Sequence, residues 1–113
     1  MPTTVVAPDQ PPRRAVIVVQ EAFGVDTHIV DVCERFAALG YLAVAPHLFH
    51  RDGVNALPQD LAVAQPHMNN LTADGIGTDI TEARNYVISQ GFSTQQVGII
   101  GFCMGGSIAL VSA

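Results

Sequence analysis

The sequence IIGFCMGGS, residues 99–107, sets the architecture expected for the whole chain. β-Branched residues run into a cysteine that has glycines two positions before and two positions after it. The spacing Gly-x-Cys-x-Gly is typical of a nucleophile elbow, a sharp turn from a buried strand into a helix. Gly101 and Gly105 are needed there because larger side chains at those positions would collide with the central residue. Gly106 further eases the packing of the helix that we expect over 107–113.

Cys103 gains two chemical advantages from this turn. The thiol lies at the N-terminus of the expected helix, whose partial positive charge favours the thiolate. The backbone N–H of Met104 faces the carbonyl oxygen that becomes an oxyanion when a nucleophile attacks. The motif therefore predicts a nucleophilic thiol.

The glycine-rich turn matches neither of two nucleotide-binding motifs. A phosphate-binding P-loop requires a lysine after its second glycine, but Ser107 follows Gly106 directly. The dinucleotide-binding pattern fails because Gly101 is followed by Phe102 and Cys103 rather than by a second glycine at the third position. A buried structural cysteine remains an open alternative, because free cysteines are often buried.

Three apolar strands are expected, at 15–19, 41–45 and 97–101. They read as continuous apolar runs, which indicates burial on both faces, as in a parallel sheet. Helical patterns at 27–39 and 79–90 separate them, and alternating strands and helices predict a doubly wound, mostly parallel α/β fold. An edge strand is also expected over Thr3–Ala7.

The helix expected at 27–39 has an apolar stripe formed by Ile29, Val32, Phe36 and Leu39. Asp26 or Thr27 is positioned to cap its start, and Gly40 to close its end in the left-handed conformation. Cys33 falls on this stripe, so we expect it in the core and without a chemical role.

The helix expected at 79–90 carries Asp79 and Glu82, which resemble a capping box, and ends at Gly91. The segment from 46 to 74 lacks a clear period. We expect loops there, with one short helix near 59–65.

Composition restricts the functional class. The chain has 113 residues, of which 49% are hydrophobic and 13% charged, with a formal net charge of −5. This is too apolar for disorder, and the acidic balance argues against nucleic acid or an anionic membrane as partner. The chain has no run long and apolar enough to suggest a membrane helix. With two cysteines and no signal-peptide pattern at residues 1–10, we expect reduced thiols and a cytoplasmic location.

Three segments together resemble the dienelactone hydrolase family. They are VVQEAFGV at 18–25, GYLAVAP at 40–46 and GFCMGG at 101–106, in the family's order and at similar spacing. The resemblance implies an α/β-hydrolase that opens a lactone or ester through a Cys-His-Asp triad, without a cofactor. No metal site is expected, because His47 and His50, three residues apart in a loop, have no further ligand candidates at metal spacing.

The resemblance also implies site residues. Cys103 matches the nucleophile, and Glu21 matches the glutamate that contacts the resting cysteine and swings away when substrate binds. Ala22 and Met104 match the residues whose backbone N–H groups form the oxyanion hole. Read without the resemblance, Glu21 is more simply a solvated carboxylate in a loop.

Departures from the family pattern bear on the substrate. His47 stands where members often have aspartate, and Ala64 stands where dienelactone hydrolases have a substrate-binding arginine, beyond Pro58-Gln59-Asp60. The nearest arginine is Arg51. Dienelactone itself is therefore in doubt as the substrate, since a carboxylate-bearing lactone needs a cationic clamp.

In α/β-hydrolases the acid and the histidine of the triad follow the nucleophile. The four histidines, at 28, 47, 50 and 67, all precede Cys103. We therefore expect residues 1–113 to be the N-terminal part of a single α/β-hydrolase domain, inactive or very slow alone. We also expect an exposed sheet edge and self-association through it. One alternative is a non-catalytic remnant, or an interaction fragment that pairs through its open sheet edge. Another is a different thiol-dependent hydrolase or transferase on the same fold.

Overall fold

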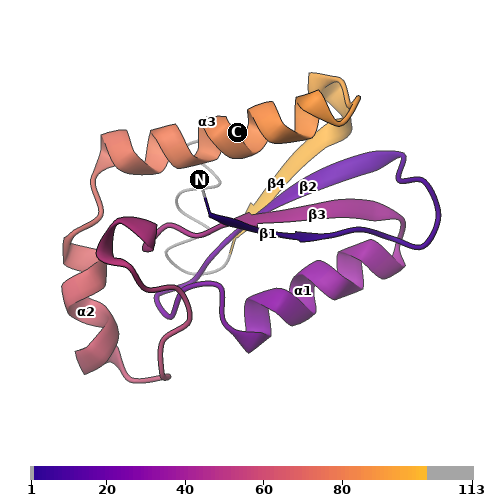
Figure 1. Ribbon diagram of the computed structural model, residues 1–113. Coiled ribbons are helices and arrows are strands. Elements are labelled where there is room, and N and C mark those ends of the chain that lie inside the picture. The colour runs from indigo at the N-terminus through magenta and orange to yellow at the C-terminus, as the bar shows by residue number, and fades with distance from the viewer. Residues whose placement is uncertain (1, 102–113) are drawn as a thin grey trace.

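The structure, a computed structural model, describes residues 2–101 as a four-stranded sheet with a long helix on each face (Figure 1). The strands are β1 (Thr3–Val6), β2 (Arg14–Val19), β3 (Tyr41–Pro46) and β4 (Val97–Gly101). The helices are α1 (Thr27–Ala38), α2 (Leu61–Asn69) and α3 (Ala73–Ser89), with short 3-10 turns η1 (His50–Asp52) and η2 (Thr94–Gln96). None of the helices in this range is long and apolar enough to cross a membrane.

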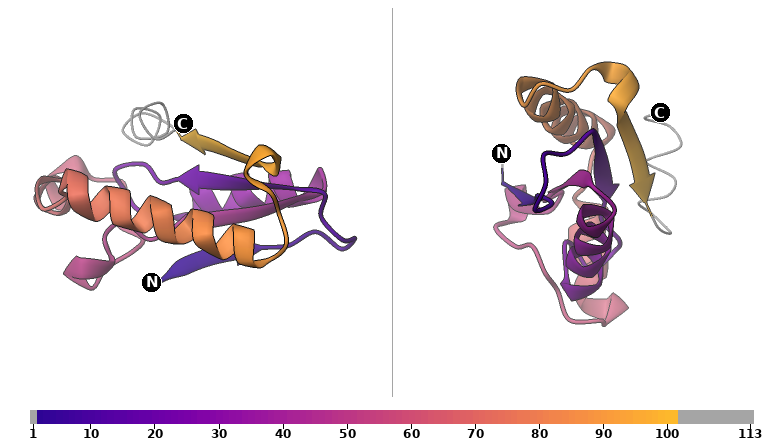
Figure 2. Two further views of the ribbon diagram at one scale, coloured as in Figure 1. Left: turned by 90° about the horizontal axis from the view of Figure 1, so that it is seen from above. Right: turned by 90° about the vertical axis from the view of Figure 1, so that its right-hand side faces the viewer.

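The strand order is β1-β3-β2-β4. The strand β2 pairs in parallel with β3 on one side and with β4 on the other, whereas β1 pairs antiparallel with β3. Figure 2 shows β4 at one edge of the sheet and the N-terminal strand at the other. The three parallel strands and the additional edge strand predicted from the sequence are confirmed, as is the mostly parallel α/β architecture.

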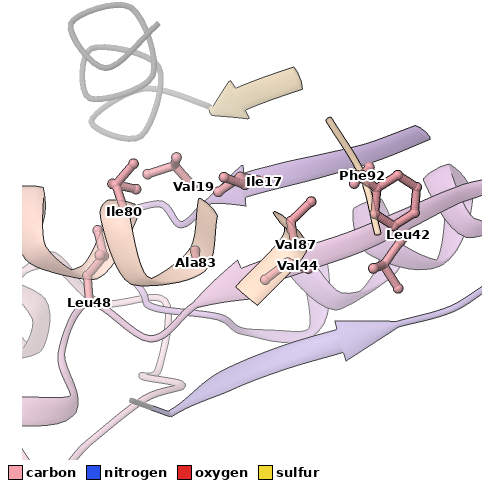
Figure 3. Packing of buried hydrophobic residues seen from close by; sticks show 10 residues of the cluster. Ile17, Val19, Leu42, Val44, Leu48, Ile80, Ala83, Val87 and Phe92 are labelled. Carbon is pink, nitrogen blue, oxygen red and sulfur yellow. The ribbon is translucent and has the colours of Figure 1, made fainter. Parts of the chain in front are cut away.

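The strands are apolar at nearly every position because both faces of the sheet are covered. Ile17 and Val19 point to the face covered by α3, where they pack with Ile80, Ala83 and Val87 (Figure 3). On the face covered by α1, the cluster contains Val16, Val18, Ile29, Cys33 and Ala43. Each large aliphatic side chain buried in this way contributes about 1.5–3 kcal/mol to the free energy of folding.

The helix α1 follows its sequence signals closely. Asp26 caps it, with its carboxylate accepting from the backbone N–H of Ile29 at 3.2 Å. At the other end Gly40 has φ +94°, the left-handed conformation that glycine adopts without strain. The sequence thus predicts both ends of α1 to within one residue.

The start predicted for α3 is wrong. The helix begins at Ala73, six residues earlier than expected, and is capped by Thr72, whose hydroxyl accepts from the N–H of Gly75 at 3.0 Å. Asp79 and Glu82 form no capping box, since both lie inside the helix. Gly75 and Gly77 weaken the helical propensity of the first turns, so the sequence pattern emerges only later.

The short helix expected near 59–65 is present but displaced, since α2 runs from Leu61 to Asn69. Asp60 caps it and accepts from the N–H of Ala62 at 2.9 Å. Pro66 lies inside the helix, where it removes one backbone donor but does not end the helix. The sequence pattern therefore overstates the breaking effect of this proline.

Candidate active site

The carboxyl ends of β2 and β4 bring two predicted site segments together. Val19 lies opposite Gly101 in the parallel register of these strands. Glu21 follows Val19 by two residues, and Gly101 is the first glycine of the elbow. From β2 the chain crosses to β3 on one side of β2, and from β3 it crosses back to β4 on the other side. Open α/β sheets bind ligands where the strand order changes direction in this way, at the carboxyl ends of the strands.

The backbone of Glu21 is held firmly at this edge. Its carbonyl accepts from the N–H of Gly24 at 3.1 Å and from Nε2 of Gln20 at 3.3 Å. The Gln20 side chain is fully buried, and its Oε1 accepts from the N–H of Leu48 at 2.8 Å. Gln20 thus ties the end of β2 to the segment that follows β3.

The loop after Glu21 is clamped by a segment distant in sequence. Gly24 has φ +79°, and a Cβ at this position would lie 1.6 Å from the carbonyl oxygen of Asn55. The Asn55 side chain accepts from the N–H of Val25 at 3.2 Å and donates to its carbonyl at 3.3 Å. The N–H of Leu57 donates to the carbonyl of Phe23 at 2.9 Å. The sequence does not point to Asn55, because a loop asparagine carries no periodic signal.

The Glu21 side chain faces a histidine. Its Oε1 lies 3.4 Å from Nε2 of His28, and the two side chains are 21% and 50% exposed respectively. His28 lies in the first turn of α1 and is half exposed, and it pairs with Glu21. The carboxylate is therefore shielded and partnered rather than freely solvated.

The structure places only part of the predicted site. Ala22 is half-buried in the loop after Glu21. The proposed nucleophile Cys103, together with Met104, Gly105, Gly106 and the helix expected over 107–113, lies outside the described residues. The roles assigned to these residues, and the catalytic roles of Glu21 and Ala22, stay predictions.

Cys33 is a core residue, as expected. Its side chain is fully buried on the apolar face of α1. Burial, with a smaller effect from the nearby Glu34 carboxylate, raises the pKa of the Cys33 thiol to about 11. At neutral pH this thiol is protonated and inert.

An ion cluster around the buried Asp79 carboxylate has no counterpart among the sequence predictions. Asp79, only 1% exposed, accepts two hydrogen bonds from Arg51, and Nε2 of His50 lies 3.0 Å from Oδ1. The hydrogen bonds to Asp79 raise the pKa of the Arg51 guanidinium. Because its guanidinium is committed to Asp79, Arg51 is poorly suited to replace the family's substrate-binding arginine. The sequence does contain one signal of this cluster. Asp79 lies next to the apolar stripe of α3, and a carboxylate in such a position is rarely buried unless it has a partner.

A second polar cluster joins η1 to α2. The His67 ring meets Asp52 at 2.7 Å, and the Asn70 side chain donates to the same carboxylate oxygen at 3.0 Å. These two hydrogen bonds lower the pKa of Asp52. The adjoining cavity of about 20 Å³ has room for a single water and not for a substrate.

His47 and His50, three residues apart, turn to different partners. Nε2 of His47 lies 2.7 Å from the Thr4 hydroxyl of β1, whereas His50 faces Asp79. Burial, and to a lesser degree the neighbouring His50, lowers the pKa of His47. His47 therefore fastens the edge strand, at the position where family members often have aspartate.

Comparison with known proteins agrees with this arrangement. The family model described as "Dienelactone hydrolase family" matches residues 1–113. A Yersinia pestis protein named "Putative carboxymethylenebutenolidase" is 38% identical over 122 residues, covering 100% of this chain and 43% of the relative. The carboxymethylenebutenolidase of Pseudomonas putida is 30% identical over 113 residues, covering 95% of this chain and 48% of the relative.

A solved structure from Klebsiella pneumoniae, titled as that of a "Putative Dienelactone Hydrolase", superposes with a TM-score of 0.80 at 31% identity. The superposition covers 100% of this chain and 48% of the Klebsiella chain. This chain spans somewhat less than half the length of the curated relatives it matches. On the match across all its residues, the chain belongs to the dienelactone hydrolase family.

Proposed function

We propose that this chain supplies the nucleophile side of a hydrolase that cleaves a lactone or ester through an acyl-enzyme on Cys103. The observation that carries the proposal is the pairing of Val19 with Gly101. Because of this pairing, the Glu21 loop and Gly101, the first glycine of the proposed elbow, lie together at the carboxyl ends of β2 and β4. Membership of a family whose relatives are named as lactone hydrolases supports the same chemistry.

In the proposed reaction the Cys103 thiolate attacks the carbonyl carbon of the substrate. The backbone N–H groups of Ala22 and Met104 stabilise the oxyanion, the carbon–oxygen bond of the leaving group breaks, and a thioester remains on Cys103. Water then cleaves the thioester. The histidine and the acid that assist this step are assigned to residues beyond this chain. The chemistry requires no cofactor.

The acyl-enzyme is tested with p-nitrophenyl acetate and the chain as it stands. Because the proposed base of deacylation is not supplied by this chain, we expect one burst of p-nitrophenolate rather than sustained turnover. Peptide mass mapping should locate one acetyl group on Cys103. Cys103→Ala should abolish the burst.

The second cysteine provides the matched control. Cys33 is buried and its pKa is about 11, so Cys33→Ala should leave the burst amplitude unchanged. Acetylation of Cys33 in the wild-type chain, or a burst that survives Cys103→Ala, would contradict the proposal.

A second candidate function is self-association through the sheet edge. Among the described residues β4 is hydrogen-bonded to β2 alone, so one side of β4 is unpaired within residues 2–101. Such an edge can pair with another chain. Gly98 is exposed in the middle of β4, and a charged side chain there should oppose pairing.

Sedimentation over a range of concentrations distinguishes this function. If the edge pairs, the wild-type chain should associate and Gly98→Lys should shift it toward the monomer. Gly77→Lys makes the same chemical change at an exposed position of α3, where a Cβ meets nothing within 4 Å. Equal association in both variants would rule out this edge as the interface.

A further inference from the structure

The contact between His28 and Glu21 joins two elements at the candidate active site. His28 is the second residue of α1, and Glu21 lies in the loop that follows β2. Their side chains approach to 3.4 Å between Nε2 and Oε1. The His28 side chain is half exposed to solvent, whereas the Glu21 side chain, 21% exposed, is largely covered.

The backbone of Glu21 has little freedom to move. Its carbonyl accepts two hydrogen bonds, and the close approach of Gly24 to the Asn55 backbone anchors the turn that follows. The position of the carboxylate therefore depends on the Glu21 side-chain torsions, and these can change without disturbing the backbone. The side chain that contacts the carboxylate therefore determines its orientation at the carboxyl ends of β2 and β4, where Gly101 lies.

His28 is on a rigid support. The Asp26 side chain caps α1, and the Asp26 carbonyl accepts from the backbone N–H of Val30 at 3.0 Å. Gln59 donates to the other carboxylate oxygen of Asp26 at 3.2 Å. The first turn of α1 is thus fixed from both sides, so the imidazole is presented from a fixed backbone position.

An imidazole carried on a fixed backbone position, beside a carboxylate whose side-chain torsions can change, is suited to a positioning role. We infer that His28 is a positioning residue for Glu21, holding its carboxylate at the first turn of α1. The helix N-terminus adds to this preference, since its partial positive charge attracts a carboxylate. The inference deepens the proposed function, and rests on it for the catalytic consequence alone. Without His28, the Glu21 carboxylate is free to rotate toward the carboxyl end of β4. Under the proposed function, its negative charge would then oppose formation of the Cys103 thiolate.

The contact is tested first without reference to activity. The chain has three glutamates, Glu21, Glu34 and Glu82, of which the latter two are exposed. Carbon-13 labelling of the glutamate carboxylates gives few resonances, and Glu21→Gln identifies that of Glu21. In His28→Ala the Glu21 resonance should move toward those of Glu34 and Glu82. His28→Gln, whose amide retains a donor, should restore much of the difference.

Arg35→Ala is the matched control. Arg35 is on the same helix, and its replacement removes an ion pair with Asp31, 2.9 Å in length, but that pair is exposed and extends to the last turn of α1. The Glu21 resonance should stay in place in this variant. An unmoved Glu21 resonance in His28→Ala overturns the inference, whatever the activity of the chain.

The kinetic arm uses the p-nitrophenyl acetate burst. We expect His28→Ala to slow acylation roughly tenfold, because a misplaced charged group at a reacting centre has effects of at least this order. His28→Gln should recover most of the rate. In the Glu21→Gln background, His28→Ala should have no further effect, since His28 acts through Glu21. An undiminished effect in that background overturns the inference.

The two proposals fail in different ways. If no acetyl group appears on Cys103 in any variant, the proposed function fails, while the Glu21 resonance still decides the contact with His28. If acylation occurs and the resonance does not move, the acyl-enzyme proposal stands and the positioning role is wrong.

Discussion

Arg51 and Asp79, 28 residues apart in the sequence, form a bidentate ion pair. Nη1 donates to Oδ2 at 2.9 Å and Nη2 donates to Oδ1 at 3.0 Å. His50 approaches Oδ1 from the neighbouring position, so both oxygens of a buried carboxylate have partners. The pair fastens η1, which follows β3, onto the middle of α3.

Breaking this pair from one side should destabilise the fold. Arg51→Met keeps the aliphatic stem but deprives the buried Asp79 carboxylate of its two guanidinium donors. A buried carboxylate that loses its donors is costly, so the urea midpoint should fall clearly. Arg51→Met combined with Asp79→Leu should recover most of the loss, because the double replacement leaves no unpaired carboxylate in the core. A double variant no more stable than Arg51→Met would contradict this account.

The buried hydrogen bond between Gln20 and Leu48 should contribute to the stability of the fold. Gln20→Leu removes the acceptor of the Leu48 N–H in a buried position. An unsatisfied buried donor costs about 1–3 kcal/mol, so the free energy of unfolding in urea should fall by about 2 kcal/mol. Gln10→Leu, at an exposed position, provides the control and should change it little.

Alanine substitutions at Gly24 and Gly40 should distinguish the cost of backbone strain from the cost of a steric collision. Both have positive φ, but a Cβ at Gly24 meets the Asn55 backbone whereas a Cβ at Gly40 meets nothing within 4 Å. Gly40→Ala should cost about 1 kcal/mol of unfolding free energy from the left-handed conformation alone. Gly24→Ala should cost several times as much, since the loop after Glu21 must move. Equal losses in urea unfolding would show that the close approach is not maintained in solution.

His47 should make the fold sensitive to mild acid. Its pKa in the folded state lies below the ordinary value of 6.5, chiefly because of burial. The unfolded chain therefore takes up the proton first, and the contribution of His47 to stability is lost as the pH falls below 6.5 toward the folded-state pKa. His47→Asn does not titrate and can still bond Thr4. Its thermal midpoint should fall less than that of the wild type between about pH 7 and pH 5. Parallel pH curves for the two proteins would refute the assignment.

Local patterns predict much of the fold. The strands expected at 15–19, 41–45 and 97–101 are correct to within one residue because buried parallel strands are apolar at nearly every position. The ends of α1 are correct because Asp26 and Gly40 act on their nearest neighbours. Where the local signal is weak, as in the glycine-containing start of α3, the predicted boundary is wrong.

The sequence by itself determined the order of strands and helices, the core position of Cys33, and a glycine spacing around Cys103 that predicts a nucleophilic thiol. These features depend on short-range periodicity and on residues close in the chain. Only the tertiary structure decided that Val19 lies beside Gly101, that Asn55 clamps Gly24, that Arg51 belongs to Asp79, and that His28 faces Glu21. These contacts join segments whose relative positions are set by sheet register and helix packing, and neither is encoded in any single local pattern.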